Sequence, residues 1–285
     1  MSLDIGRAFS EGISRTVAKN GIALVAVFAG IALLTTVLFQ SLTVGLMDAF
    51  VNAISGATPE ELGLSQDEYD MLLEEMEVAA ADAREMMPVA QPLTAGIAAA
   101  GLLVVALLSE AASIVAVRLF ATEETGTIPQ EILTRNILLA TLNGFVGAIV
   151  VWGFIILGLV LFVVPGIFLA IAFYFVRQEI AIQDKNFVQA MADSWRLTKG
   201  YRIEVFALAL VVFIVSQFEL VTGFLEPIVG PTAAVLLTAI ASGVLGIFGA
   251  AVVTRAYVQL EDERAEAEVE KDPYAAPLGP DDIPK

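Results

Sequence analysis

Long apolar stretches separated by short polar segments are the dominant pattern along the chain. A helix needs about 20 predominantly apolar residues, each adding about 1.5 Å, to cross a hydrocarbon core about 30 Å thick. Four stretches of about that length cover residues 21–42, 93–117, 205–224 and 232–254. The pattern therefore predicts four single membrane spans.

A fifth apolar stretch, residues 137–176, is too long for one span. As a helix it would measure roughly 60 Å, about twice the thickness of the bilayer core. Arg135 and Arg177 flank it, so both of its ends are expected on the same side of the membrane. We therefore predict two spans, 137–157 and 159–176, that form a tight hairpin.

The turn of this hairpin is expected at one of two glycines. Gly158 lies near the middle of the stretch, and Pro165-Gly166 is the stronger turn signal. Because glycine tolerates a positive φ, a turn at Pro165-Gly166 predicts that Gly166→Val lowers the folded yield far more than Gly158→Val.

Composition supports a membrane protein. The 285 residues are 58% hydrophobic and 16% charged, and the mean hydropathy is +0.80. Soluble domains average about 45–50% apolar and about 25% charged residues. The predicted fold class is therefore all-α, a six-span transmembrane helical bundle over residues 21–257 with interfacial amphipathic helices.

The basic residues predict the orientation of the bundle. Fourteen of the fifteen lie in segments that this topology places on one side of the membrane, and the exception is Arg84. Because Lys and Arg favour cytoplasmic loops, we expect both termini in the cytoplasm and a multi-pass protein of the cell membrane.

Two polar segments on the cytoplasmic side predict amphipathic helices. Residues 1–20 should form a helix that Asp4 caps and that lies flat on the membrane, with an apolar residue at every fourth position: Ile5, Phe9, Ile13 and Val17. Residues 186–199 should form a second surface helix, which Gly200 ends in a left-handed conformation. Its apolar face would comprise Phe187, Met191 and Trp195.

Residues 43–91 form an acidic insertion on the outer side, with eleven acidic residues and one basic residue. Capping boxes that begin at Thr58 and Ser65 predict a short helix and a longer one. An apolar stripe on the longer helix should pack on the ends of the spans: Tyr69, Leu72, Leu73, Met76, Ala80, Ala83 and Met87. The alternative is that this stripe is a docking face for a membrane-protein partner. A homo-oligomer is the other assembly that the sequence allows.

The charge distribution extends the picture. Residues 258–285 carry nine acidic and three basic residues and are predicted to be an acidic cytoplasmic tail, helical over a short stretch from Glu261 and then disordered. A net charge of −17 with no Cys is typical of salt-adapted proteins, whose surface charges are screened by concentrated counterions. We therefore expect a halophilic, archaeal source. The lipid bilayer is the expected partner, and nucleic acid is disfavoured.

The residue inventory disfavours catalysis. The absence of Cys and His removes thiol nucleophiles, zinc thiolate sites and the commonest general base. No phosphate-binding loop or nucleophile elbow occurs. We expect no catalytic residue, no cofactor and no metal site, and hence no enzyme.

Among the polar side chains within the predicted spans, three are candidate functional groups: Glu110, Gln217 and Glu219. One interpretation is an ion or solute path lined by Glu110 and one of the other two. The other is a buried hydrogen bond for Glu110 and interfacial positions for Gln217 and Glu219. A protonated, hydrogen-bonding Glu110 predicts that Glu110→Gln is nearly silent, while Glu110→Leu costs about 1–2 kcal/mol.

Two motifs occur together, Val164-Pro165-Gly166-Ile167 late in an apolar stretch and a seven-residue motif before a new span, Ser194-Trp195-Arg196-Leu197-Thr198-Lys199-Gly200. With them, residues 4–257 outside the acidic insertion resemble a six-helix integral membrane family. This family includes the membrane domain attached to some glycerophosphoryl diester phosphodiesterases. Residues 127–131 look like its haloarchaeal branch. The resemblance implies structural roles for Pro165, Gly166, Ser194, Trp195, Arg196, Lys199 and Gly200.

The phosphodiesterase activity of that family belongs to a separate barrel domain of about 250 residues, for which this chain has no room. The sequence therefore favours a multi-pass membrane protein without enzymatic activity, a scaffold or accessory protein. The alternative is a transporter or permease for a small solute or ion, which should show broken helices and charged residues that line a cavity.

Overall fold

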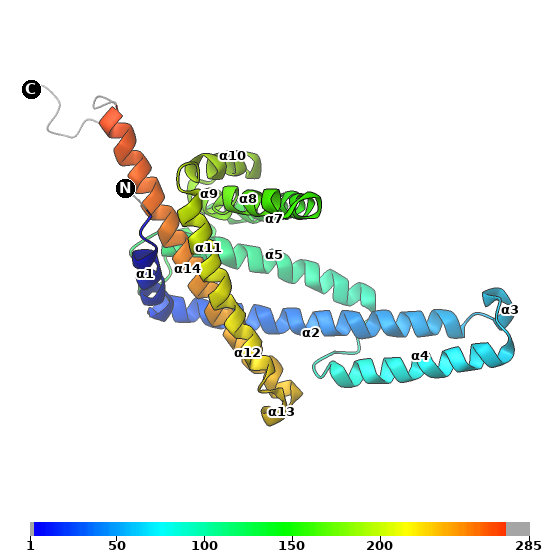
Figure 1. Ribbon diagram of the computed structural model, residues 1–285. Helices are drawn as coiled ribbons and strands as arrows, with labels where there is room; N and C mark the ends of the chain where they lie inside the picture. The colour runs from blue at the N-terminus through cyan, green and yellow to red at the C-terminus, as the bar shows by residue number, and fades with distance from the viewer. Residues whose placement is uncertain (1–2, 272–285) are drawn as a thin grey trace, which may run out of the picture. The chain divides into compact units, whose positions relative to one another are not determined.

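The computed structural model describes residues 3–271, including all side chains except those of Glu219 and residues 268–271. It contains helices and no strand within that range (Figure 1). Six helical segments are long and apolar enough to cross a membrane, which confirms the prediction of an all-α bundle with six spans. These segments are Lys19–Ser55, Ala95–Phe120, Ile137–Leu161, Val163–Gln183, Arg202–Val229 and Pro231–Ala267.

The chain forms two compact units. The first contains residues 1–24, 110–216 and 245–285, and the second contains residues 25–109 and 217–244. Helices α2 (Lys19–Ser55), α5 (Ala95–Phe120) and α14 (Pro231–Lys271) each contribute to both units.

In the second unit, the acidic insertion forms the two predicted helices, α3 (Pro59–Leu62) and α4 (Gln66–Met86). Both capping boxes are present: Thr58 and Ser65 each accept a hydrogen bond from the backbone N–H three residues on, and the carboxylate of the Glu at that position accepts one from the backbone N–H of the cap residue. The hydrogen bonds from Ser65 hold the pKa of the Glu68 carboxyl below its usual range. The start of α4 is therefore fixed by local sequence.

Helix α4 packs back along the end of α2, as the apolar stripe predicts (Figure 1). The Tyr69 hydroxyl donates to the Ala57 carbonyl at 3.0 Å, and Arg84 forms an ion pair with Asp48. Gln40 on α2 accepts a hydrogen bond from the Val89 N–H at 3.0 Å. Arg84, the one basic residue of the insertion, thus links α4 to α2.

The hairpin turn lies at Phe162, between α7 (Ile137–Leu161) and α8 (Val163–Ala172). The expectation of a turn at Pro165-Gly166 is wrong, because both residues lie in the first turn of α8. Proline is accepted there since the first N–H groups of a helix have no partner within it. Neither Gly158 nor Gly166 has a positive φ. They are instead the point of closest approach between α7 and α8.

The second arm of the hairpin is not one helix. It breaks after α8, and α9 (Val176–Gln183) resumes after a short turn. The fully buried Ser194 bridges this break: its hydroxyl donates to the Ala172 carbonyl at 2.9 Å and accepts from the Phe175 N–H at 3.2 Å. Broken backbone within a membrane needs such internal partners.

Both amphipathic helices form, and each predicted apolar stripe is partly buried. Helix α1 (Ile5–Val17) begins at the predicted cap, where Asp4 accepts from the Arg7 N–H at 2.8 Å. Its Ile5 and Phe9 pack against a core cluster, whereas Ile13 and Val17 are exposed and the small Ala8 is buried.

In α10 (Phe187–Leu197), Phe187 and Met191 pack against a second core cluster, and Trp195 is exposed. Ala190, Ser194 and Leu197 are buried on the same helix.

Two of the predicted spans, 205–224 and 232–254, have other boundaries in the structure. The short helix α6 (Gln130–Thr134) precedes α7. The apolar segment Arg202–Val229 divides into α11 (Arg202–Ser216), η1 (Gln217–Glu219), α12 (Leu220–Gly223) and α13 (Glu226–Val229). Helix α14 continues to Lys271, in agreement with the short helix predicted from Glu261 at the start of the tail. The predicted tail over 272–285 lies outside the described residues.

Gly158→Ala and Gly166→Ala should each destabilise the protein by about 1–3 kcal/mol, because the added methyl groups overpack the hairpin. A Cβ at Gly158 would lie 2.8 Å from the Gly166 Cα, and one at Gly166 would lie 2.6 Å from the Leu159 nitrogen. Thermal unfolding in detergent measures the loss. Gly153→Ala is the matched control, since its Cβ would meet open space. A large loss at Gly166 alone would contradict this packing.

Candidate functional site

The predicted intramembrane carboxylate, Glu110, is paired rather than alone. The Arg177 guanidinium donates to it through Nε at 3.1 Å and through Nη2 at 2.8 Å. The Glu110 side chain is 7% exposed and that of Arg177 is 45% exposed. This bidentate ion pair joins α5 to α9 within the first unit.

Helix α7 leaves the space that the pair occupies. A Cβ on Gly144 would collide with the Glu110 carboxylate. The glycine is therefore required by close approach of a side chain and not by backbone conformation. Three helices thus define the position of one carboxylate.

The sequence shows Arg177 as a base that flanks an apolar stretch, and its partner is 67 residues earlier in the chain. From the sequence, a carboxylate at this depth must be protonated, paired with a cation or facing water. The structure shows Glu110 paired with Arg177. The expectation that Glu110→Gln is nearly silent no longer follows, because the substitution would remove the charged partner of Arg177.

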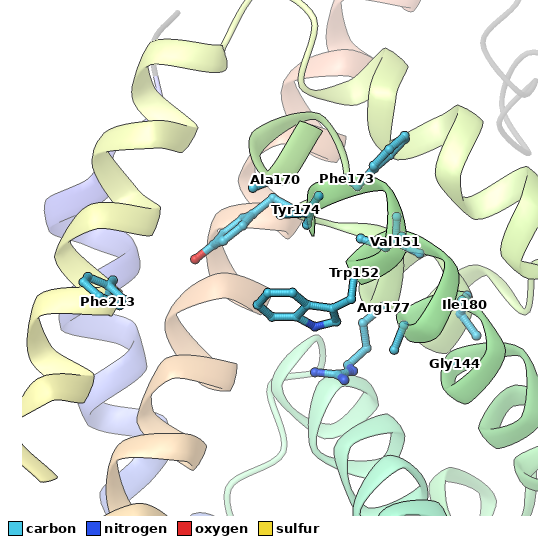
Figure 2. A pocket seen from close by; sticks show the side chains of 13 residues that line it. Gly144, Val151, Trp152, Ala170, Phe173, Tyr174, Arg177, Ile180 and Phe213 are labelled. Atoms are coloured by element: carbon cyan, nitrogen blue, oxygen red, sulfur yellow. The ribbon is translucent and has the colours of Figure 1, made fainter. Parts of the chain in front are cut away.

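A cavity of about 490 Å³ opens beside this pair (Figure 2). Its lining residues come from α7, from the α8–α9 segment and from α11, and they include Gly144, Val151, Trp152, Ile155, Ala170, Phe173, Tyr174, Arg177, Ile180 and Phe213. Most of the lining is apolar. Among the described residues that line it, Arg177 alone is charged.

A second arginine holds the other end of the same segment. Arg118 is buried, donates through Nε to the Ala181 carbonyl at 2.8 Å, and pairs with Asp184 at 3.0 Å. Arg135 also pairs with Asp184, at 3.2 Å. Asp184 has a positive φ of 52°, which places its carboxylate between the two guanidinium groups. These contacts fasten the end of α9 to α5 and to the loop before α7.

A third cluster links α1, α14 and the loop after α5. Arg255 pairs with Glu11, and with Glu123 at 3.0 Å, while Arg15 also pairs with Glu123. Burial of Glu11 opposes its ionisation, but hydrogen bonds from Arg255 and Arg7 outweigh burial and hold its pKa below the usual range. Charged residues in the first unit therefore serve largely to join helices.

The other two candidate polar residues belong to the other compact unit. Gln217 and Glu219 lie in η1, which belongs to the second unit, whereas Glu110 belongs to the first. Gln217 is exposed. The side chain of Glu219 lies outside the described part of the chain.

The motif residues surround the break between α8 and α9. Trp195 packs edge-on against Phe168 at 5.3 Å between ring centroids, and the Arg202 guanidinium lies over the Phe168 ring at 4.4 Å. Arg196 pairs with Asp193. Lys199 is exposed, and Gly200 has the predicted left-handed conformation, with a φ of 105°.

Sequence reasoning missed the buried carboxylates of α9 and α10. Glu179 is fully buried and pairs with Lys185 at 2.7 Å, and Lys185 also pairs with Asp193 at 2.8 Å. Glu179 and Lys185 are six residues apart, which is not a spacing that pairs side chains on a helix, so the sequence carried no signal for this pair. Within residues 3–271, no three His, Cys, Asp or Glu side chains are grouped so that they could hold a metal ion.

Loss of either partner of the Glu110–Arg177 pair should destabilise the protein by about 1–3 kcal/mol. This is less than the roughly 3–5 kcal/mol expected for a fully buried pair, because Arg177 is half exposed. The Glu110→Gln/Arg177→Gln double variant should recover part of the loss, since neither charge remains unpaired. Thermal unfolding in detergent of the two single variants and the double variant measures the coupling. Strict additivity would show that the pair is not formed.

Comparisons with known proteins bear on the family and not on an activity. No curated protein and no solved structure matches the chain. A family match covers residues 3–260, which include all six apolar segments almost completely. It does not name the phosphodiesterase membrane domain, so that resemblance stays a prediction. The chain belongs to the family described as Domain of unknown function (DUF7847).

Proposed function

We propose that the protein is a non-enzymatic membrane scaffold or accessory protein. The observation that supports this proposal is that Glu110 is engaged by Arg177 in an ion pair. A proton-exchanging or ion-coordinating carboxylate needs access to its cargo, whereas this one is buried behind an arginine. The Arg118 and Arg255 clusters likewise use their charges to join helices.

The exposed side of α4 supports a partner-binding role within this proposal. Met71 and Val78 lie two helical turns apart on one side of α4, and both are exposed. A membrane-protein partner or a second copy of the chain would cover them. The acidic surface of the insertion and the low Lys content support a salt-adapted, archaeal cell membrane as the setting.

A transporter is the second candidate, and one observation favours it. The segment Val163–Gln183 is broken between α8 and α9, and the cavity that contains Arg177 lies beside the break. Broken helices and charged residues near the bilayer midplane are typical of transporters. Under this alternative, the Glu110–Arg177 pair would open during transport.

A flux assay distinguishes the two candidates. The purified protein in proteoliposomes should leave proton and monovalent-ion permeability at the level of protein-free vesicles, measured with pH-sensitive and potential-sensitive dyes. Arg202→Gln, which alters a charge away from the cavity, should behave identically. Protein-dependent flux that a folded Glu110→Gln variant abolishes would replace the scaffold with the transporter.

The proposed orientation places both termini in the cytoplasm and α4 outside. Because the chain has no Cys, single cysteines report accessibility cleanly. Glu75→Cys should react with a membrane-impermeant maleimide in intact cells, and Gln189→Cys only after permeabilisation. Both positions are exposed, whereas a cysteine at the buried Ser194 would be unreactive on either side. The reverse labelling pattern would invert the topology.

A further inference from the structure

The cavity beside Arg177 presents hydrogen-bond donors without a matching acceptor. A guanidinium carries five N–H groups, and Glu110 accepts two of those of Arg177. Among the described residues, no acceptor takes up the remaining three. The Glu110 carboxylate lies behind the guanidinium, since Glu110 is buried and Arg177 is half exposed. The side of the pair that faces the cavity is therefore cationic.

Aromatic residues add to this donor character. Figure 2 shows the nitrogen-bearing edge of the Trp152 indole turned toward the Arg177 guanidinium. Trp152 can only donate a hydrogen bond, and the Tyr174 hydroxyl is the one side-chain oxygen in the lining. No acidic residue lines the cavity. A ligand that fits this end must bring oxygen acceptors and negative charge.

The rest of the cavity is apolar and faces outward. Val151, Ile155 and Phe173 line it, and Phe213 closes it from α11 (Figure 2). The side chains of Trp152 and Phe213 are largely exposed. In a membrane-spanning helix, an exposed apolar side chain contacts lipid. The cavity is thus continuous with a lipid-facing surface, and its volume of about 490 Å³ is within the range of about 300–1,000 Å³ typical of small-molecule sites.

We propose that this cavity binds a bilayer phospholipid with a net negative headgroup. The phosphate accepts hydrogen bonds from Arg177 and from the Trp152 indole, and one hydrocarbon chain of the lipid lies along the apolar wall between α7 and α11. A free inorganic anion would satisfy the donors but leave the apolar wall without contacts. A zwitterionic phospholipid would fill the wall and present the same phosphate acceptor, but the cation of its headgroup offsets the attraction between the phosphate and Arg177. This inference rests on the proposed function and names the ligand class that such a scaffold would hold.

Tryptophan fluorescence tests the proposal directly, because the chain has two tryptophans, Trp152 and Trp195. In a Trp195→Phe protein, Trp152 is the only tryptophan, and lipids with brominated acyl chains quench it on contact. Brominated phosphatidylglycerol, added to the protein in neutral detergent, should half-quench Trp152 at a several-fold lower concentration than brominated phosphatidylcholine. The preference should decrease as salt concentration rises.

Three controls make the result specific. Trp152→Phe retains Trp195, outside the cavity, and its fluorescence should show no preference between the two lipids. The Glu110→Gln/Arg177→Gln double variant should lose the preference for the anionic lipid. Arg202→Gln, made in the Trp195→Phe protein, should retain it, because Arg202 does not line the cavity.

Several outcomes would overturn the proposal. Equal quenching by the two lipids, a preference that salt does not change, or a preference retained in the double variant would each exclude binding of the headgroup at Arg177. Displacement of the brominated lipid by inorganic phosphate would assign the site to a soluble anion. These readouts require no flux, so they are independent of the assay that separates scaffold from transporter.

Discussion

The ion pair between Glu110 and Arg177 is the interaction on which the packing of the first unit depends. A carboxylate among apolar helices is costly to ionise unless a cation and hydrogen bonds compensate for lost solvation. Arg177 provides both, but only if α9 lies close to α5, and only if α7 has no side chain at Gly144. The geometry of three helices thus follows from one buried charge.

The break between α8 and α9 poses the same problem for backbone groups, which also need polar partners where water is absent. Carbonyl and N–H groups freed by the interruption need partners where water is excluded. Ser194 on α10 provides a donor and an acceptor at this point, and it is fully buried. The packing of α10 against the hairpin is therefore part of what makes the break tolerable, and the break in turn lets α9 start at Val176 and place Arg177 beside Glu110.

The elements that could be predicted from the sequence are those that interactions between neighbouring residues determine. The helices over 59–62 and 66–86 follow from capping boxes, and the left-handed Gly200 follows from the end of α10. The Glu110–Arg177 pair joins residues far apart in the chain, so the sequence pattern could not identify the partner of Glu110. The hairpin turn was misplaced because glycine serves close packing as well as turns, and only the structure shows that Gly158 and Gly166 pack against each other. Similarly, Ile13 is exposed and Ala8 is buried on the same helix, and the hydrophobic periodicity alone did not distinguish the two positions.

A structural role and a ligand-binding role for Arg177 reinforce each other. Two of its donors fix the guanidinium against Glu110, which restricts the rotamers of a long, flexible side chain. The donors that remain are therefore held in place before any ligand arrives, and preorganisation of this kind reduces the entropy lost on binding. A lysine could not do both, because its ammonium group lacks the planar fork that pairs with a carboxylate while presenting further donors on another edge. The same arginine can thus hold the helices together and define which lipid lies against them.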